Sequence, residues 1–247
     1  MIYMKKTALV LFLLITAKGI FAADFSLSAG GGGLFGYTFT RYTLEGTALD
    51  GNLRSIQTMD RINYGGFLFF DATYGVLSVI FQGGSSFYAE DLMIAGNSEM
   101  SGNGRGEEIS LGISLMGKYP FSINGRVTWF PMLGVEYHFA LRQWRQPEGE
   151  FTVDRTTGSL PEDLDKNGNP YPLSAWNSWW INIGAGFDFY IVGPLFLRSE
   201  FIFGFRLPTR YEMGALDLVR DQFTASNIRL AGLTGSPNFR IGLGYRF

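Results

Sequence analysis

The chain has 247 residues, of which 46% are hydrophobic and 16% aromatic, and its formal net charge is −2. This weakly acidic balance excludes a nucleic-acid-binding protein, which needs a basic patch. The sequence contains no cysteine, which excludes a disulfide framework and a lipid-modified cysteine.

The N-terminal segment has the order of a secretory signal peptide. Lys5 and Lys6 precede a short apolar run over 8–17, and the small residues Ala22 and Ala23 follow it. The run is too short to span a bilayer as a helix. We therefore expect residues 1–23 to be a signal peptide and residues 24–247 to form one domain, an uncleaved anchor being the alternative.

Eight segments of this domain combine period-two alternation with flanking turn residues, as β-strands do. The alternation is strictest at the C-terminus, where Phe239, Ile241 and Leu243 fall on one face and Arg240 and Gly242 on the other. Beyond the signal, the sequence has no apolar run long enough for a transmembrane helix, so a membrane protein of this composition must be a closed barrel. The expected strands cover 24–42, 58–72, 74–90, 107–120, 126–144, 176–191, 195–209 and 238–247.

The connections between these strands alternate in length. Short turns are expected at 72–75, 122–125 and 192–194, and long loops at 43–57, 91–106, 145–175 and 210–236. This asymmetry predicts an all-β fold, a transmembrane antiparallel up-and-down β-barrel of eight strands with short periplasmic turns and long extracellular loops. Ten strands, with an extra hairpin from 145–175, and a soluble β-sandwich with an aromatic core are the alternatives. Pro131 falls inside a strand, where it removes a hydrogen-bond donor, and predicts a bulge.

The faces opposite the apolar ones are expected to line the lumen. They carry Asp71, Glu108, Lys118, Glu136, His138, Arg142, Asp188, Arg198, Glu200, Arg206, Arg240 and Arg246. An eight-stranded barrel is just wide enough for side chains to fill it, and buried charges must pair.

The sequence therefore favours an ion-pair network that plugs the lumen over an ion-selective pore. The expected pairs are Glu136 with Arg240, Glu200 with Arg198 or Arg240, and Asp71 and Asp188 with Lys118 and Arg246. With His138 these residues form the candidate network.

Two further patterns concern chemistry. His138 is the single histidine and shares a face with Glu136, but Ala140 stands where a neighbouring serine would be needed, so we do not expect an enzyme. Asp163, Asp165 and Asn167 occupy positions one, three and five of a calcium-loop pattern. Position twelve, where a bidentate glutamate is expected, is Ser174. A weak calcium site or a polar surface turn fits this segment, and no other cofactor is expected.

The signal, the strand count, the loop asymmetry and the terminal Tyr245-Arg246-Phe247 together resemble small bacterial outer-membrane barrels of the OmpA transmembrane domain, OmpX and OmpW type. The resemblance covers residues 24–247. It implies an outer-membrane location, contact with outer-membrane lipid, and insertion by the barrel assembly machinery with Tyr245 and Phe247 as the assembly signal. Two functions follow from it: a surface-exposed barrel with a largely plugged lumen whose loops bind an extracellular ligand, or an OmpW-like narrow passive channel for small or hydrophobic solutes.

Overall fold

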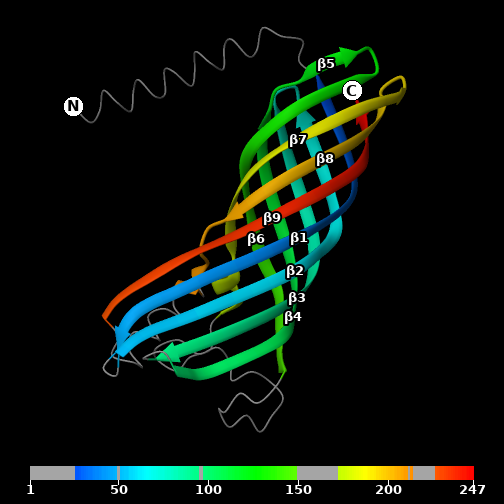
Figure 1. Cartoon of the computed structure of the whole chain (residues 1–247). Coiled ribbons are helices and arrows are strands. Elements are labelled where there is room, and N and C mark those ends of the chain that lie inside the picture. Colours follow the sequence, from blue (N-terminus) through cyan, green and yellow to red (C-terminus); the bar gives the residue numbers. More distant parts are fainter. Residues whose placement is uncertain (1–25, 49–50, 95–96, 149–171, 211, 214–225) are drawn as a thin grey trace, which may run out of the picture.

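The computed structural model describes residues 26–48, 51–94, 97–148, 172–210, 212–213 and 226–247 (Figure 1). The expected signal peptide and the calcium-loop residues Asp163, Asp165 and Asn167 lie outside these ranges. Among the described residues, no helix is long and apolar enough to cross a bilayer.

The described residues form antiparallel strands, one short 3-10 helix, and a few helical residues at 210 and 212–213. In chain order these are β1 (Leu27–Ala48), β2 (Gly51–Ala72), β3 (Gly75–Ile94), β4 (Asn97–Lys118), β5 (Phe121–Asn124), β6 (Val127–Glu148), η1 (Leu173–Trp176), β7 (Ser178–Val192), β8 (Leu195–Arg206) and β9 (Ser226–Arg246). Neighbouring strands pair in the order β4-β3-β2-β1-β9-β8-β7-β6, and the pairing of β4 with β6 closes the ring. The short β5 continues along β6 beyond the end of β4, at the end of the barrel where the C-terminus lies (Figure 1). The expected eight-stranded up-and-down barrel is confirmed.

The expected short turns are also found. β2 and β3 are joined through Thr73 and Tyr74, and β7 and β8 through Gly193 and Pro194. Gly193 has a φ of 53°, a left-handed conformation that glycine adopts without steric cost. The hairpin before β6 turns at Gly125 and Arg126, at the end of the segment 122–125 where the turn was expected.

Several strands run further than the sequence indicated. Segments 43–57 and 91–106, which we expected to be loops, are largely strand, and β1 stays paired with β2 up to Ala48 opposite Gly51. The start of β9 at Ser226 also lies well before the expected 238. The outward face becomes polar there, as in the Glu45–Arg54 ion pair at 3.8 Å. A search for strands with one apolar face therefore misses these extensions. They lie beyond the apolar part of the wall, at the end away from the short turns.

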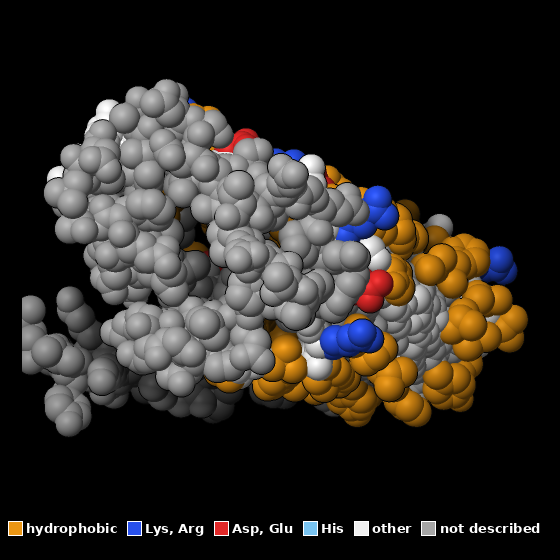
Figure 2. Space-filling model, turned by 90° about the horizontal axis from the view of Figure 1, so that it is seen from below, with side chains coloured by type: hydrophobic (Ala, Val, Ile, Leu, Met, Phe, Trp, Pro, Cys, Tyr) orange, Lys and Arg blue, Asp and Glu red, His pale blue; other side chains and the backbone are white. Residues whose placement is uncertain are grey.

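The two faces of the wall differ in chemistry. Large hydrophobic side chains point outward and are about half exposed, and Figure 2 shows this apolar cover along the wall. Soluble proteins rarely expose a contiguous apolar surface of this extent, whereas a barrel in a bilayer requires it. The outward set includes Phe35, Tyr64, Leu68, Phe70, Val79, Phe81, Ile113, Leu115, Leu133, Ile183, Phe201, Phe239 and Leu243.

Pro131 does not produce the bulge we expected. Its pairing with Ala185 on β7 lies within a continuous ladder, and the wall is interrupted on the other side, where β4 ends at Lys118 and β5 begins at Phe121. The Tyr119 N–H donates to the Pro131 carbonyl at 3.2 Å, but proline has no N–H to return. The interruption therefore coincides with the missing donor.

A bulge occurs instead near the other end of β6. Ile109 of β4 pairs with Arg142, while the next residue, Ser110, pairs with Ala140, which leaves Leu141 as the extra residue. Arg142 consequently shares the outer face with Ile109 and is exposed. Our prediction that Arg142 lines the lumen was wrong.

Candidate functional site in the lumen

The part of the lumen near the short turns, at the end where the C-terminus lies, is built around Arg198 of β8. Its side chain is fully buried and donates to both carboxylate oxygens of Asp188, with two bonds of 2.7 Å. It also contacts the carboxylate of Asp71, which in turn accepts a 2.6 Å bond from the Lys118 ammonium. Two acids and two bases therefore neutralise each other where water is excluded.

Aromatic rings enclose the same guanidinium. The Cζ atom of Arg198 lies 4.4 Å from the ring centroid of Phe69, 5.1 Å from that of Phe130 and 5.3 Å from that of Phe196. Desolvated cation–π contacts of this kind are each worth up to about 2 kcal/mol. These rings belong to a buried apolar cluster inside the barrel with Leu34, Phe67, Val76, Ile80, Met116, Met132 and Ile202. We call this cluster, together with Arg198, Asp188, Asp71 and Lys118, the plug.

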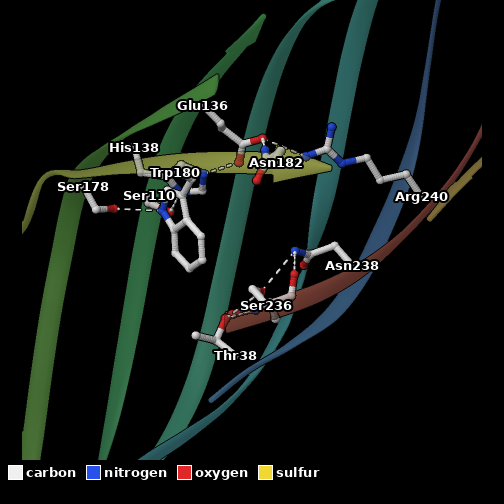
Figure 3. A network of polar contacts seen from close by, with 11 residues as sticks. Thr38, Ser110, Glu136, His138, Ser178, Trp180, Asn182, Ser236, Asn238 and Arg240 are labelled. Carbon is white, nitrogen blue, oxygen red and sulfur yellow. Dashed lines mark hydrogen bonds and ion pairs between the residues drawn. The ribbon is translucent and has the colours of Figure 1, made fainter. Parts of the chain in front are cut away.

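A second layer lies further along the lumen and centres on Glu136 of β6 (Figure 3). Arg240 reaches across from β9 and donates to Glu136 Oε2 at 2.9 Å, and Asn182 Nδ2 donates to the same oxygen at 3.0 Å. The other carboxylate oxygen is hydrogen-bonded to His138 Nε2, and His138 Nδ1 lies 3.2 Å from Ser110 Oγ. This polar layer is buried and extensively hydrogen-bonded, as low-dielectric surroundings require.

The chain of Ser110, His138 and Glu136 has the residue types of a hydrolase triad. Its surroundings do not suit that chemistry. Ser110 is only 1% exposed, and the cavity beside Glu136 and His138 holds about 10 Å³, room for roughly one water molecule. An acyl substrate has no space there. The hydrogen bonds that link Ser110, His138 and Glu136 therefore serve to satisfy buried polar groups.

Hydroxyl and amide groups fill the next part of the lumen, on the side of the Glu136 layer away from the short turns. Thr38 and Ser236 hydroxyls lie 2.8 Å apart, and Asn63 Nδ2 donates to Thr38 at 2.8 Å. Thr40 and Thr234 hydroxyls are 3.1 Å apart across the β1–β9 seam. This hydrogen-bonded layer adjoins the Glu136 layer on the side away from the short turns.

Two further ion pairs lie at this level. Arg61 pairs with Glu108, and Arg206 pairs with Glu212. Glu212 also accepts a 2.8 Å bond from the Thr209 N–H, while its own N–H donates to the Thr209 hydroxyl at 3.2 Å. This reciprocal capping box fixes the position of the Glu212 carboxylate after the end of β8.

The structure brings most of the candidate network together, in two layers. Asp71, Lys118, Asp188 and Arg198 lie in the plug, whereas Glu136, His138 and Arg240 lie in the Glu136 layer. Glu200 lies between them, with its carboxylate 3.8 Å from Arg198 Nη1.

Arg246 lies apart from both layers. It donates to Ser26 Oγ at 3.4 Å and stands over the Tyr190 ring at 5.1 Å, so among the described residues it does not pair with Asp71 or Asp188 as we expected. Arg198, which we expected as one of two possible partners of Glu200, lies 3.8 Å from that carboxylate and in addition holds Asp71 and Asp188.

The C-terminal residues lie at the short-turn end of the barrel. The Phe247 N–H donates to the Leu27 carbonyl at 2.8 Å, and the rings of Tyr245 and Phe247 are 5.6 Å apart and exposed. Within the described part of the chain, no group of three or more acidic or histidine side chains could hold a metal ion.

No protein-family model matches the chain, and no curated protein matches it. Among solved structures, it is similar to the outer membrane protein OprG from Pseudomonas aeruginosa, at 11% identity and a TM-score of 0.40, over 90% of this chain and 95% of that one. The N-terminal β-barrel domain of Pseudomonas aeruginosa OprF is similar at 13% identity and a TM-score of 0.31, over 86% and 97% of the two chains. Neisserial surface protein A is similar at 12% identity and a TM-score of 0.30, again over 86% and 97%.

The class of protein follows from the wall itself. Eight antiparallel strands close on each other, the outer face is apolar, and the inner face is polar and charged. A bilayer-spanning sheet has to satisfy all its backbone hydrogen bonds in this closed form. The chain is a small outer-membrane β-barrel, located in the bacterial outer membrane.

Proposed function

We propose that this chain is a surface-exposed outer-membrane barrel whose lumen stays closed, so that its role is structural and interactive rather than conductive. The observation that carries the proposal is the plug. Arg198 is held by Asp188 and Asp71 and packed between Phe69, Phe130 and Phe196, with no exposed surface. A layer of this composition leaves ions no hydrated path, and opening it would strand paired charges.

The proposed partners follow from the two ends of the barrel. The long connections that follow β6 and β8 would meet the extracellular ligand, since loops carry recognition on a rigid scaffold. The lipid-facing wall contacts outer-membrane lipid. The exposed Tyr245 and Phe247 would be the signal that the barrel assembly machinery reads.

The alternative function, a narrow passive channel, needs a continuous path through both lumen layers. The cavity beside Glu136 and His138 holds about 10 Å³, and the plug lies between it and the short-turn end. Small and hydrophobic solutes are larger than this space. The geometry therefore supports the closed barrel better than the channel.

Planar-bilayer recording tests this proposal. We expect the wild-type barrel to give no stepwise current. The double variant Phe69→Ala/Phe196→Ala should conduct, because it removes two of the rings that enclose Arg198. Phe201→Ala is the matched control on the same strand as Phe196, since Phe201 points to lipid and is 55% exposed. It should remain silent, and a steady wild-type current would refute the closed lumen.

A further inference from the structure

An open groove of about 860 Å³ runs along the outer wall where β4 gives way to β5. It is lined by Tyr74, Gly117, Tyr119, Pro131, Leu133 and Ile183, with Lys118 and Met132 beneath. Apolar pockets of this size are typical of sites for small molecules or lipid chains.

The groove is a built feature of the chain. Both neighbours at the interruption are imino acids: Pro120 follows Tyr119, and Pro131 stands opposite on β6. Pro131 accepts the 3.2 Å hydrogen bond from the Tyr119 N–H but has no N–H to return, and Pro120 lies where β4 has ended and β5 has not begun. The regular pairing with β6 therefore has a gap between Lys118 and Phe121. The rings of Tyr74 and Tyr119, with centroids 6.0 Å apart, lie at this gap.

The chemistry of the groove selects an apolar occupant. Its single cationic side chain, Lys118, is already bound to Asp71 at 2.6 Å and lies 4.7 Å from the Phe130 ring centroid. The Lys118 side chain is only 7% exposed and its ammonium is paired with Asp71, so it is not accessible to a ligand in the groove. An anionic headgroup or a charged solute would therefore gain little there.

The position of the groove identifies that occupant. It opens onto the lipid-facing wall, since Leu133 and Ile183 are both more than half exposed among the outward hydrophobic side chains. It lies beside Tyr74 in the β2–β3 turn, at the short-turn end, which faces the periplasmic leaflet. We propose that this groove binds an acyl chain of one phospholipid of the periplasmic leaflet and retains it more tightly than the lipid around the rest of the wall.

Native mass spectrometry of the full-length barrel tests this proposal. The protein is folded into vesicles of phosphatidylethanolamine and phosphatidylglycerol, extracted, and washed with detergent until lipid is lost from the general wall. We expect the wild type to retain one phospholipid. Gly117→Phe should lower retention about tenfold, because excluding even a few methylene groups from an apolar surface weakens binding strongly.

The variant and its control both accept a side chain. A Cβ added at Gly117 would lie 3.6 Å from its nearest heavy atom, the Leu133 carbonyl oxygen. A Cβ added at Gly33 on β1 would lie 3.8 Å from its own nearest heavy atom, the Gly65 carbonyl oxygen. Gly33→Phe therefore adds the same ring to the lipid-facing wall away from the groove, and it should retain phospholipid as the wild type does. Equal retention in Gly117→Phe and the wild type, equal loss in both variants, or a wild type without lipid would each overturn the proposal.

Photo-crosslinking gives a second readout that does not depend on a variant. A phospholipid with a diazirine at mid-chain, added to the same vesicles, should label peptides that contain Leu133 or Ile183 above all others. Labelling spread evenly over the outward residues of all strands would contradict a specific groove.

Discussion

Replacing Arg198 by methionine will destabilise the barrel by about 3–5 kcal/mol, the usual cost of leaving buried charges without their partner. Asp188 would lose two hydrogen bonds of 2.7 Å, and Asp71 would keep only Lys118. Methionine fills much of the space between the three rings, so the loss reflects charge rather than a cavity. Urea unfolding of the barrel in phosphatidylcholine vesicles, followed by tryptophan fluorescence, measures this effect.

Two companion variants isolate the cause. Arg246→Met removes an exposed arginine that pairs with neither Asp71 nor Asp188, and it should change the free energy of unfolding by less than about 0.5 kcal/mol. Arg198→Met combined with Asp188→Asn removes the orphaned charge and should recover more than half of the loss, because replacing both members of a buried pair is often nearly neutral. If the double variant were as unstable as Arg198→Met, unpaired charge would not be the cause.

Gly32→Ala will destabilise the barrel by about 3 kcal/mol or more, whereas Gly33→Ala will be neutral or stabilising by up to about 1 kcal/mol. A Cβ at Gly32 would lie 1.9 Å from the Ile241 carbonyl oxygen and 2.4 Å from the Gly242 Cα. These are backbone atoms of β9, so they can move only if the pairing of the first and last strands, β1 and β9, opens. At the neighbouring Gly33, the nearest heavy atom to an added Cβ is 3.8 Å away.

The same urea titration compares the two alanine variants. The gel mobility of unheated samples adds a second readout, since only a closed barrel runs as the compact form. Similar free energies of unfolding for both variants would show that the close approach at the seam does not limit the fold.

Much of this fold could be predicted from sequence because a lipid-exposed barrel imposes a strict pattern. Outward residues such as Ile241 and Leu243 have to be apolar, and the neighbours Arg240 and Gly242 face the lumen. The strand count and the turns depend on this alternation and on glycine and asparagine at the hairpins. The pairing of Glu136 with Arg240 could be expected from their faces and heights alone.

Other features depend on strand register, which no local pattern contains. Ser110 is two residues along β4 from Gly112, the residue opposite His138, and only this pairing brings it to the imidazole. The bulge at Leu141, which turns Arg142 outward, likewise depends on how β4 and β6 align. The polar ends of β1 to β4, on the side away from the short turns, lack the apolar face by which strands can be predicted from sequence.

The most direct test of the closed, lipid-embedded barrel uses the absence of cysteine from the sequence. Ser78→Cys and Ser114→Cys are nearly isosteric probes of the lumen, because both serines are buried and face each other on β3 and β4. Val79→Cys probes the lipid face, and Ser122→Cys on the exposed β5 is the positive control.

In intact vesicles with reagent on both sides, we predict that a charged, water-soluble maleimide labels Ser122→Cys alone, and that all four variants react after unfolding. Labelling of Ser78→Cys and Ser114→Cys would reveal a water-filled pore, and labelling of Val79→Cys would place this wall outside the bilayer; either result would contradict the account.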